Sequence, residues 1–489
     1  MSSVRRSLLY SLADSYLGVS LQLASTLIIS RLLTPTEIGI FAVAAALAAL
    51  ASTFRDFGVA EYLIQEKDLT VAKIRAAFAA NLVVSWLMAL LLFASSGAVA
   101  DFYRQPGVAD VMRIQAVNFL IIPFGAVTMA YFRRELNYRP IFIAGLLGNT
   151  TSFVVATVGA WRGYGYLSLA WSSLAGVVVT VAISVVMRPK GFPILPSLKG
   201  VADVARFGKH AIGIYLFGQI GKSAPEAVVG RILDMASVAF FSRANGLMEI
   251  FNRTVLRAVL PVCLPYFSQA ARAGQETRIG YLKATSMLTG IGWPFFLVIG
   301  ILAFSTIRLL YGVQWMPAVP LAQILCLAAV FELPYFLAGE VMIAHGRVDQ
   351  SNRLQLLVQA LRLASLVLVV PFGMVGACWG LAGAGLMGAV ISHQFLHRII
   401  GLRLADVLRA CVGSAGVAAC CSGPVLLLVL LVPQTEANYQ GVLVGATLLA
   451  ALSWLIALHF FAHPFLDELR SLSAKVLSNT RRKTSNEHE

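Results

Sequence analysis

The chain has little charge for its length. Of its 489 residues, only 12% are Asp, Glu, Lys or Arg, whereas 58% are hydrophobic. The mean hydropathy is +0.79. A soluble globular protein carries about 25% charged residues, and disordered chains are rich in charge and poor in apolar residues. The composition therefore excludes a soluble enzyme and a disordered protein, and much of the surface must face lipid.

Motifs for catalysis, nucleotide binding and metal binding are also missing. There is no G-x-x-x-x-G-K-[ST] loop, which excludes an ATP-driven pump for this chain. The six cysteines are scattered without a C-x-x-C pair, and this predicts ordinary buried thiols. The seven histidines fall at or beyond the ends of apolar segments, without a zinc spacing that includes a carboxylate. We expect no enzyme, no catalytic residue, no metal and no cofactor.

Long apolar runs are what the sequence has instead. Runs such as 39–53 and 76–95 are nearly continuous and lack the period-two alternation of a transmembrane barrel. Because a helical span needs about 20 apolar residues, we expect an all-α integral membrane protein with about 14 transmembrane helices. The expected spans are 8–30, 36–54, 76–99, 108–130, 140–160, 164–187, 207–230, 235–260, 283–304, 317–338, 352–370, 373–395, 407–432 and 440–461.

The distribution of basic residues gives the expected orientation. With the N-terminus in the cytoplasm, 26 lysines and arginines fall in the inner segments and six in the outer ones. Cytoplasmic loops of membrane proteins carry this excess, so we expect both termini in the cytoplasm. The net charge of +15 is then topogenic, and no nucleic-acid partner is predicted.

The chain divides after the sixth expected span. A proline-containing linker follows that span, and residues 31–41 (RLLTPTEIGIF) align without a gap with residues 231–241 (RILDMASVAFF) at an offset of 200. Internal repeats with matching span order are typical of transporters. The predicted parts are an N-terminal six-helix lobe at 1–187, a cytoplasmic linker at 188–206, a C-terminal six-helix lobe at 207–396, two additional transmembrane helices at 397–463, and a cytoplasmic tail at 464–489.

Ionisable residues inside the expected spans are concentrated in the second half. Such groups are costly in a membrane and typically mark a substrate or ion pathway. The span at 207–230 places Gln219, Lys222 and Glu226 on one helical face, and the next span places Glu249, Arg253 and Arg257 on another, with Arg243 beside it; Glu332 and Arg362 belong to later spans. The repeat-equivalent face of the first span carries the neutral residues Gln22 and Thr26.

Two interpretations of these charges follow from the sequence. In the first, Lys222–Glu226 and Glu249–Arg253 are structural i,i+4 ion pairs. This pairing leaves Arg243 and Arg362 without a partner on their own helices. In the second, a cavity between the halves is cationic on one wall, and it would suit a phosphate or diphosphate because arginine binds phosphate bidentately.

Several segments together resemble the bacterial polysaccharide transporter family, whose superfamily also includes multidrug and toxin extrusion proteins and lipid II flippases. They are RLLTPTEIGIFAVA (31–44), FRDFGVAEYLIQEKDLT (54–70), FRRELNYRP (132–140), FFSRANGL (240–247), LPYFS (264–268), LLYGVQWMPAVP (309–320) and HGRVDQSNR (345–353). The resemblance implies two six-helix lobes around a central cavity, plus two C-terminal helices. It also implies export of an undecaprenyl-diphosphate-linked oligosaccharide across the bacterial inner membrane. Ala239 departs from the glycine expected there.

The working hypothesis is a lipid-linked oligosaccharide flippase for exopolysaccharide, capsule or O-antigen synthesis. A polysaccharide polymerase and chain-length machinery are candidate partners. Candidate substrate-binding residues are Lys222, Arg243, Arg253, Arg362, Gln22 and Gln219, and candidate coupling residues are Glu226, Glu249 and Glu332. A multidrug exporter of the same fold and a membrane-bound polysaccharide polymerase are the alternatives. Cationic drugs do not suit a cationic cavity, and the outer segments are short for a polymerase.

Overall fold

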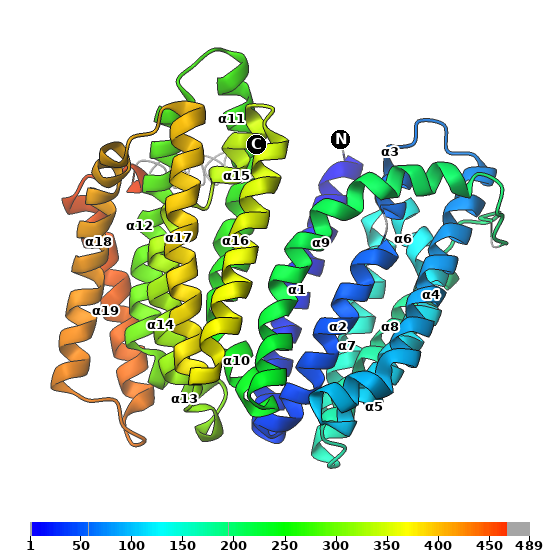
Figure 1. The fold of residues 1–489 in the computed structure, drawn as a ribbon, viewed down its shortest axis with the longest axis horizontal. Coiled ribbons are helices and arrows are strands. Elements are labelled where there is room, and N and C mark those ends of the chain that lie inside the picture. Colours follow the sequence, from blue (N-terminus) through cyan, green and yellow to red (C-terminus); the bar gives the residue numbers. More distant parts are fainter. Residues whose placement is uncertain (1, 57, 194, 467–489) are drawn as a thin grey trace, which may run out of the picture. The chain divides into compact units, whose positions relative to one another are not determined.

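The computed structural model describes residues 2–56, 58–193 and 195–466, and this part of the chain is helical without a strand (Figure 1). The helices are α1 (Ser2–Leu32), α2 (Pro35–Asp56), α3 (Val59–Gln65), α4 (Val71–Tyr103), α5 (Pro106–Ile121), α6 (Pro123–Arg134), α7 (Tyr138–Trp161), α8 (Tyr166–Val186), α9 (Val201–Ile232), α10 (Met235–Phe251), η1 (Asn252–Leu256), α11 (Arg257–Arg272), α12 (Thr277–Ile301), α13 (Ala303–Leu310), η2 (Val313–Trp315), α14 (Ala318–Glu332), η3 (Leu333–Tyr335), α15 (Ala338–Ala344), α16 (Val348–Val369), η4 (Val370–Phe372), α17 (Met374–Ile400), α18 (Leu404–Leu431) and α19 (Tyr439–Phe460).

The expected all-α membrane fold is confirmed, and the number of spans stays a prediction. Among the described residues, ten helices are long and apolar enough to cross a membrane, or eleven if the bent pair α5 and α6 is one span. The bend is 54° and falls between Ile121 and Pro123, because proline has no N–H to continue the helix. The expected span at 108–130 is therefore broken into two helices.

The helices form two compact units, Met1–Ser242 and Arg243–Glu489. The limits predicted for the lobes, the linker and the two additional helices stay predictions. The tail predicted at 464–489 falls almost wholly outside the described residues.

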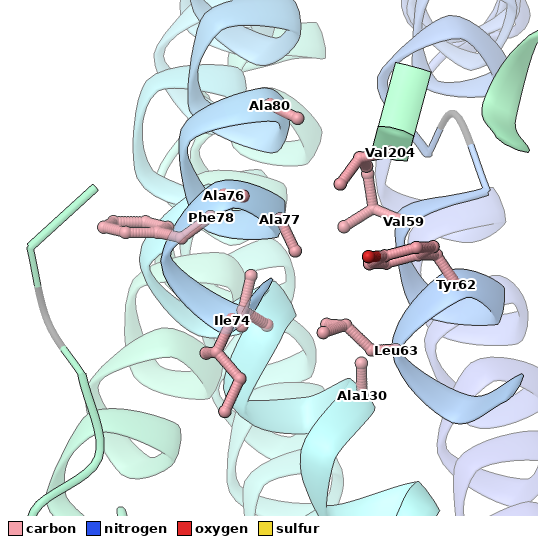
Figure 2. Packing of buried hydrophobic residues seen from close by; sticks show 11 residues of the cluster. Val59, Tyr62, Leu63, Ile74, Ala76, Ala77, Phe78, Ala80, Ala130 and Val204 are labelled. Carbon is pink, nitrogen blue, oxygen red and sulfur yellow. The ribbon is translucent and has the colours of Figure 1, made fainter. Parts of the chain in front are cut away.

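A small apolar cluster joins four helices of the first unit (Figure 2). Val59, Tyr62 and Leu63 of α3 pack against Ile74 and Ala77 of α4, and the cluster also takes in residues of α6 and α9. Small side chains let helices approach closely, and this is how helices associate where lipid offers an equally apolar alternative. The cluster holds α3 against the starts of α4 and α9.

Arg134 fixes the end of α3 and so connects the segment at 132–140 to the segment at 54–70. Its guanidinium donates to the carbonyl oxygen of Leu63 at 2.7 Å and also to those of Glu66 and Lys67. The last carbonyls of a helix lack intrahelical partners, so a cation there satisfies them. The segment at 132–140 thus terminates the helix supplied by the segment at 54–70.

The linker predicted at 188–206 is anchored to the body of the first unit. Arg75 Nε donates to the carbonyl oxygen of Leu195 at 2.9 Å, and Ser197 N donates to the carbonyl oxygen of Arg75 at 3.1 Å. Arg188 donates to Thr128 Oγ1 at 2.8 Å and to the carbonyl oxygen of Phe124. These bonds connect the linker to α4 and α6, so the linker is held against the first unit.

The predicted repeat forms two matching helix corners, both in the first unit. After α1, Leu33 N donates to the carbonyl oxygen of Ile29 at 2.9 Å; after α9, Leu233 N donates to that of Val229 at 2.9 Å. The residues that follow cap the next helix. Thr34 and Glu37 form a capping box at the start of α2, and Asp234 Oδ1 accepts from Ser237 N at 2.7 Å at the start of α10.

The second unit is closed on one side by α18 and α19, drawn in orange and red in Figure 1. Helix α18 packs on both α12 and α19. The loop between α18 and α19 is fixed by Gln434, whose Nε2 donates to the carbonyl oxygen of Ile301 at 2.9 Å and whose Oε1 accepts from Ser305. Arg308 and Glu436 add an ion pair at 2.6 Å. The pair of helices is therefore anchored at this end by polar contacts.

The other end of the pair is held by a buried histidine. His463 lies just beyond the end of α19, as the sequence predicted, and is 2% exposed. Its Nδ1 accepts from Phe465 N at 3.2 Å, and its Nε2 lies 3.1 Å from Ser414 Oγ. Ser414 Oγ in turn donates to the carbonyl oxygen of Ser286 on α12 at 3.0 Å. Burial lowers the pKa of His463, which favours the neutral ring.

Candidate functional site

Arg243 of α10 is stacked on aromatic rings contributed by the segment at 309–320. Its Cζ lies 5.1 Å from the ring centroid of Trp315 and 5.4 Å from that of Tyr311. Both rings are buried, and Gly312 between them has φ +106°, a conformation that favours glycine. A cation over aromatic faces is held electrostatically by the ring quadrupoles. The Nε atom of Arg243 is buried and has no hydrogen-bond partner among the described residues.

Glu249 and Arg253 form the ion pair that the i,i+4 spacing predicted. Arg253 Nε lies 3.1 Å from Glu249 Oε1, and Asn252 Nδ2 donates to Glu249 Oε2 at 3.1 Å. The Arg253 side chain is 32% exposed and the Glu249 side chain 41%. The carboxylate is therefore held from two sides while water or a substrate can still reach the pair.

A π-helix, η1, begins at Asn252, three residues after Glu249 and within the expected span at 235–260. A π-turn contains an extra residue compared with an α-turn. Since each residue of an α-helix turns the axis by about 100°, the extra residue changes the helix register by that amount. The expectation that Arg257 shares a helical face with Glu249 and Arg253 assumed an unbroken α-helix. The π-helix η1 interrupts the α-helical winding between Glu249 and Arg257.

Glu332 and Arg362 form an ion pair between α14 and α16. The sequence offered Arg362 no partner on its own helix, and the partner comes from 30 residues away. Each side chain is about one-third exposed. Gly385 of α17 lies against the carboxylate, since a Cβ atom there would meet Glu332 Oε1 at 1.9 Å.

The remaining predicted residues lie on α1 and α9 of the first unit. Gln219 Nε2 donates to Ser223 Oγ at 3.0 Å, and Gln22 is exposed. Glu226 is partly buried and makes no hydrogen bond or ion pair with the described side chains. The side chain of Lys222 falls outside the described residues, so the predicted Lys222–Glu226 pair stays a prediction.

The structure thus places the predicted site residues of the second unit in three separate contacts. Sequence reasoning missed Tyr311, Trp315 and Asn252, which support the charged groups. Aromatic residues spaced four apart around a glycine in the segment at 309–320 were the available signal for the first two. In the described part of the chain, no group of three His, Cys, Asp or Glu residues is arranged to hold a metal ion.

Comparison with known proteins identifies the family. The family described as "Polysaccharide biosynthesis protein" matches residues 28–320. The teichuronic acid biosynthesis protein TuaB of Bacillus subtilis is 24% identical over 371 residues, which are 73% of this chain and 74% of that protein. The lipopolysaccharide biosynthesis protein WzxC of Escherichia coli is 21% identical over 382 residues, which are 77% of each chain.

The fold has a counterpart among solved structures. The lipid II flippase MurJ in an inward closed conformation superposes with a TM-score of 0.74 and 15% identity, and the match covers 94% of this chain and 99% of that one. At this identity the likeness concerns the fold. The family match, by contrast, covers more than half of the sequence, and the chain belongs to the polysaccharide biosynthesis protein family.

Proposed function

We propose that the chain is a transporter that moves an undecaprenyl-diphosphate-linked oligosaccharide from the inner to the outer leaflet of a bacterial inner membrane. The observation that carries the proposal is the family match over residues 28–320 on a fold of membrane-length helices. Two relatives are named for the biosynthesis of teichuronic acid and of lipopolysaccharide, and a solved structure with this fold is named a lipid II flippase. The product would be an exopolysaccharide, a capsule or an O-antigen, and the chain itself is no enzyme.

The proposed orientation places both termini in the cytoplasm. The support is the excess of lysine and arginine in alternate loops, which is the charge bias of cytoplasmic segments. In this orientation the corners α1–α2 and α9–α10 lie at the outer face. A polymerase and chain-length machinery would take over the glycan there, because the lipid-linked unit emerges on that side.

Arg243 is the substrate contact with the strongest support. Its guanidinium is held over two buried aromatic rings, and its Nε is left without a hydrogen bond. A buried donor without a partner is costly, and a phosphate oxygen would satisfy it. The stacking fixes the plane of the guanidinium, so less conformational freedom is lost when a diphosphate binds. Lys222, Gln22 and Gln219 of the first unit are likewise proposed as substrate-binding residues, on the sequence pattern alone.

The two ion pairs suggest how binding could be coupled to proton uptake. Each pair joins a proposed substrate-binding arginine, Arg253 or Arg362, to a proposed coupling carboxylate, Glu249 or Glu332. A diphosphate that engages the arginine would displace the carboxylate from it. The freed Glu249 or Glu332 would then be the coupling carboxylate, and Glu226 is proposed as a third one.

The leaflet position of the lipid-linked unit tests the function. Cells depleted of this protein would be analysed by mass spectrometry of undecaprenyl-linked glycans, with a membrane-impermeant reagent that reports the leaflet. We expect a complete repeat unit to accumulate on the inner leaflet, and re-expression of the protein to clear it.

Two other outcomes would overturn the proposal. A complete unit that is exposed on the outer face would indicate a block in polymerisation or ligation. No accumulation of any lipid-linked glycan, with the polymer still made, would indicate that this chain transports something else.

A further inference from the structure

A basic pocket lies where α17 ends and α18 begins, away from the three contacts described above. Its volume is about 420 Å³, and it is lined by His393, Gln394, His397, Arg398, Arg403 and Leu404. All of these residues belong to the second unit. The lining consists of two arginines, two histidines, one glutamine and one leucine, and no carboxylate is among them.

Two of the histidines are fixed in position. His397 Nδ1 lies 2.9 Å from the carbonyl oxygen of Leu402, so this nitrogen donates and the ring is held in place. His393 Nδ1 lies 3.3 Å from Tyr335 OH, and the two imidazole rings are stacked with centroids 6.4 Å apart. The rings therefore form a preformed wall, which lowers the entropic cost of binding.

The two arginines are not neutralised by the protein. Neither Arg398 nor Arg403 makes an ion pair with a described residue. Arg403 occupies the N-cap of α18, a 28-residue helix. The N-terminus of α18 has a carboxylate of its own, because Asp406 Oδ2 accepts from Arg403 N at 3.4 Å and lies 3.6 Å from Arg278 Nη1. The guanidinium groups of Arg398 and Arg403 are thus the charges of the pocket that have no counter-charge among the described residues.

An apolar stripe leads away from the pocket along α18. Leu404, Leu408 and Val412 are spaced by four residues and are 54%, 60% and 65% exposed. They lie in a helix that is apolar enough to span the membrane, so the stripe faces acyl chains. The same ligand can therefore place an anionic head in the pocket and an apolar tail along the stripe.

We propose that this pocket binds the phosphate headgroup of an anionic phospholipid from the surrounding bilayer, with its acyl chains along Leu404, Leu408 and Val412. Basic pockets between transmembrane helices at the inner face are suited to such headgroups. The inference uses the proposed orientation but not the proposed transport activity. Lipid binding can be measured without transport, so the two proposals fail separately.

Native mass spectrometry of the purified full chain tests the site. Phosphatidylglycerol is titrated against the wild type, against the double variant Arg398→Gln/Arg403→Gln, and against the control Arg272→Gln/Arg347→Gln. The control removes the same charge from two exposed positions elsewhere in the second unit. Phosphatidylcholine, undecaprenyl phosphate and inorganic phosphate are titrated in parallel.

We expect phosphatidylglycerol to bind the wild type and the control alike, and the double variant about thirtyfold more weakly, since each interfacial arginine contributes about fivefold. If the double variant does not fold, Arg398→Gln and Arg403→Gln are measured singly, each with about a fivefold loss. Equal binding by the pocket variants and the control would overturn the proposal. Undecaprenyl phosphate or inorganic phosphate binding here in preference to phosphatidylglycerol would also overturn it.

Discussion

The α1–α2 corner and the α9–α10 corner have the same backbone and different chemistry. Leu33 and Leu233 make the same hydrogen bond to the preceding helix, and Thr34 and Asp234 cap the following one. Thr34 uses a hydroxyl and Asp234 a carboxylate for that task. The corner therefore requires a hydrogen-bond acceptor at the capping position, and this acceptor can be neutral or charged.

The helices that lead into the two corners differ in the same way. Thr26 and Ser30 of α1 donate to carbonyl oxygens one turn earlier, so these polar groups are satisfied within their own helix. Helix α9 places Lys222 and Glu226 at the positions equivalent to Gln22 and Thr26. Two helix corners with the same backbone can therefore follow a helix with a neutral polar face, α1, or a helix with a charged face, α9.

The largest expected effect comes from Arg243→Ala, which removes the proposed substrate contact of the second unit. Loss of one partner of a desolvated charge pair costs about 2–5 kcal/mol, which is at least about thirtyfold in binding. Polymer output measured in a deletion strain should fall accordingly, and Arg243→Lys should restore part of it. Arg162→Ala, an exposed arginine of the first unit, serves as the control. Normal output from Arg243→Ala at normal expression would contradict the assignment.

Gly39→Ala tests how closely the first corner approaches the second. A Cβ atom at Gly39 would lie 1.7 Å from the carbonyl oxygen of Met235, so the backbone must move. Overpacking of this kind costs about 1–3 kcal/mol, and the melting temperature of the purified protein should fall. Gly97→Ala, with nothing within 4 Å, should not lower it. Ala239, at the equivalent position, tolerates its methyl group fully buried. Equal melting temperatures for the two glycine variants would show that the approach is looser.

Gly385→Ala tests the ion pair between Glu332 of α14 and Arg362 of α16. The added methyl group would displace the Glu332 carboxylate from its place beside Arg362. We expect a loss of about 1–2 kcal/mol in stability, together with reduced polymer output. Gly383→Ala on the same helix meets nothing within 4 Å and should leave both unchanged. If both variants behave alike, the close contact does not constrain the pair.

Thr34→Ala and Asp234→Ala compare the two caps directly. Each removes the side-chain acceptor at a helix N-terminus, a loss of about 1 kcal/mol. Thermal unfolding of the purified variants should show similar shifts. A much larger effect at Asp234 would mean that its charge, and not only its capping bond, matters there.

The smallest expected effect is the dependence of stability on pH through His463. Its folded pKa is lowered by burial, while the unfolded pKa is about 6.5. The stabilisation is therefore complete above the unfolded value and is lost as the pH falls below it. Melting temperatures measured between pH 7 and pH 5 should decline more for the wild type than for His463→Gln. Parallel declines would assign the pH dependence to other groups.

The sequence predicted what depends on local spacing. Apolar runs gave the helices, the offset of 200 gave the matching corners, and the i,i+4 spacing gave the Glu249–Arg253 pair. These features follow from helical periodicity and from capping, which a single chain displays. The broken span at α5 and α6 also had a local sign, the proline at 123.

What the sequence did not predict depends on contacts between helices. Arg362 meets Glu332 from another helix, and Arg243 meets rings about 70 residues further along the chain. Periodicity says which residues share a face but not which faces meet. The burial of His463 was missed for the same reason, because its partners lie on α12 and α18.

The π-helix at Asn252–Leu256 has a consequence for how this protein can vary between lineages. One residue removed from that stretch would restore ordinary α-helical winding and rotate all of α11 by about 100° relative to α10. A single-codon deletion or insertion could thus exchange the set of side chains that α11 directs inward, without altering any of them. We would look for such one-residue gaps at this position among related sequences, since each gap would turn a different face of α11 toward the protein interior.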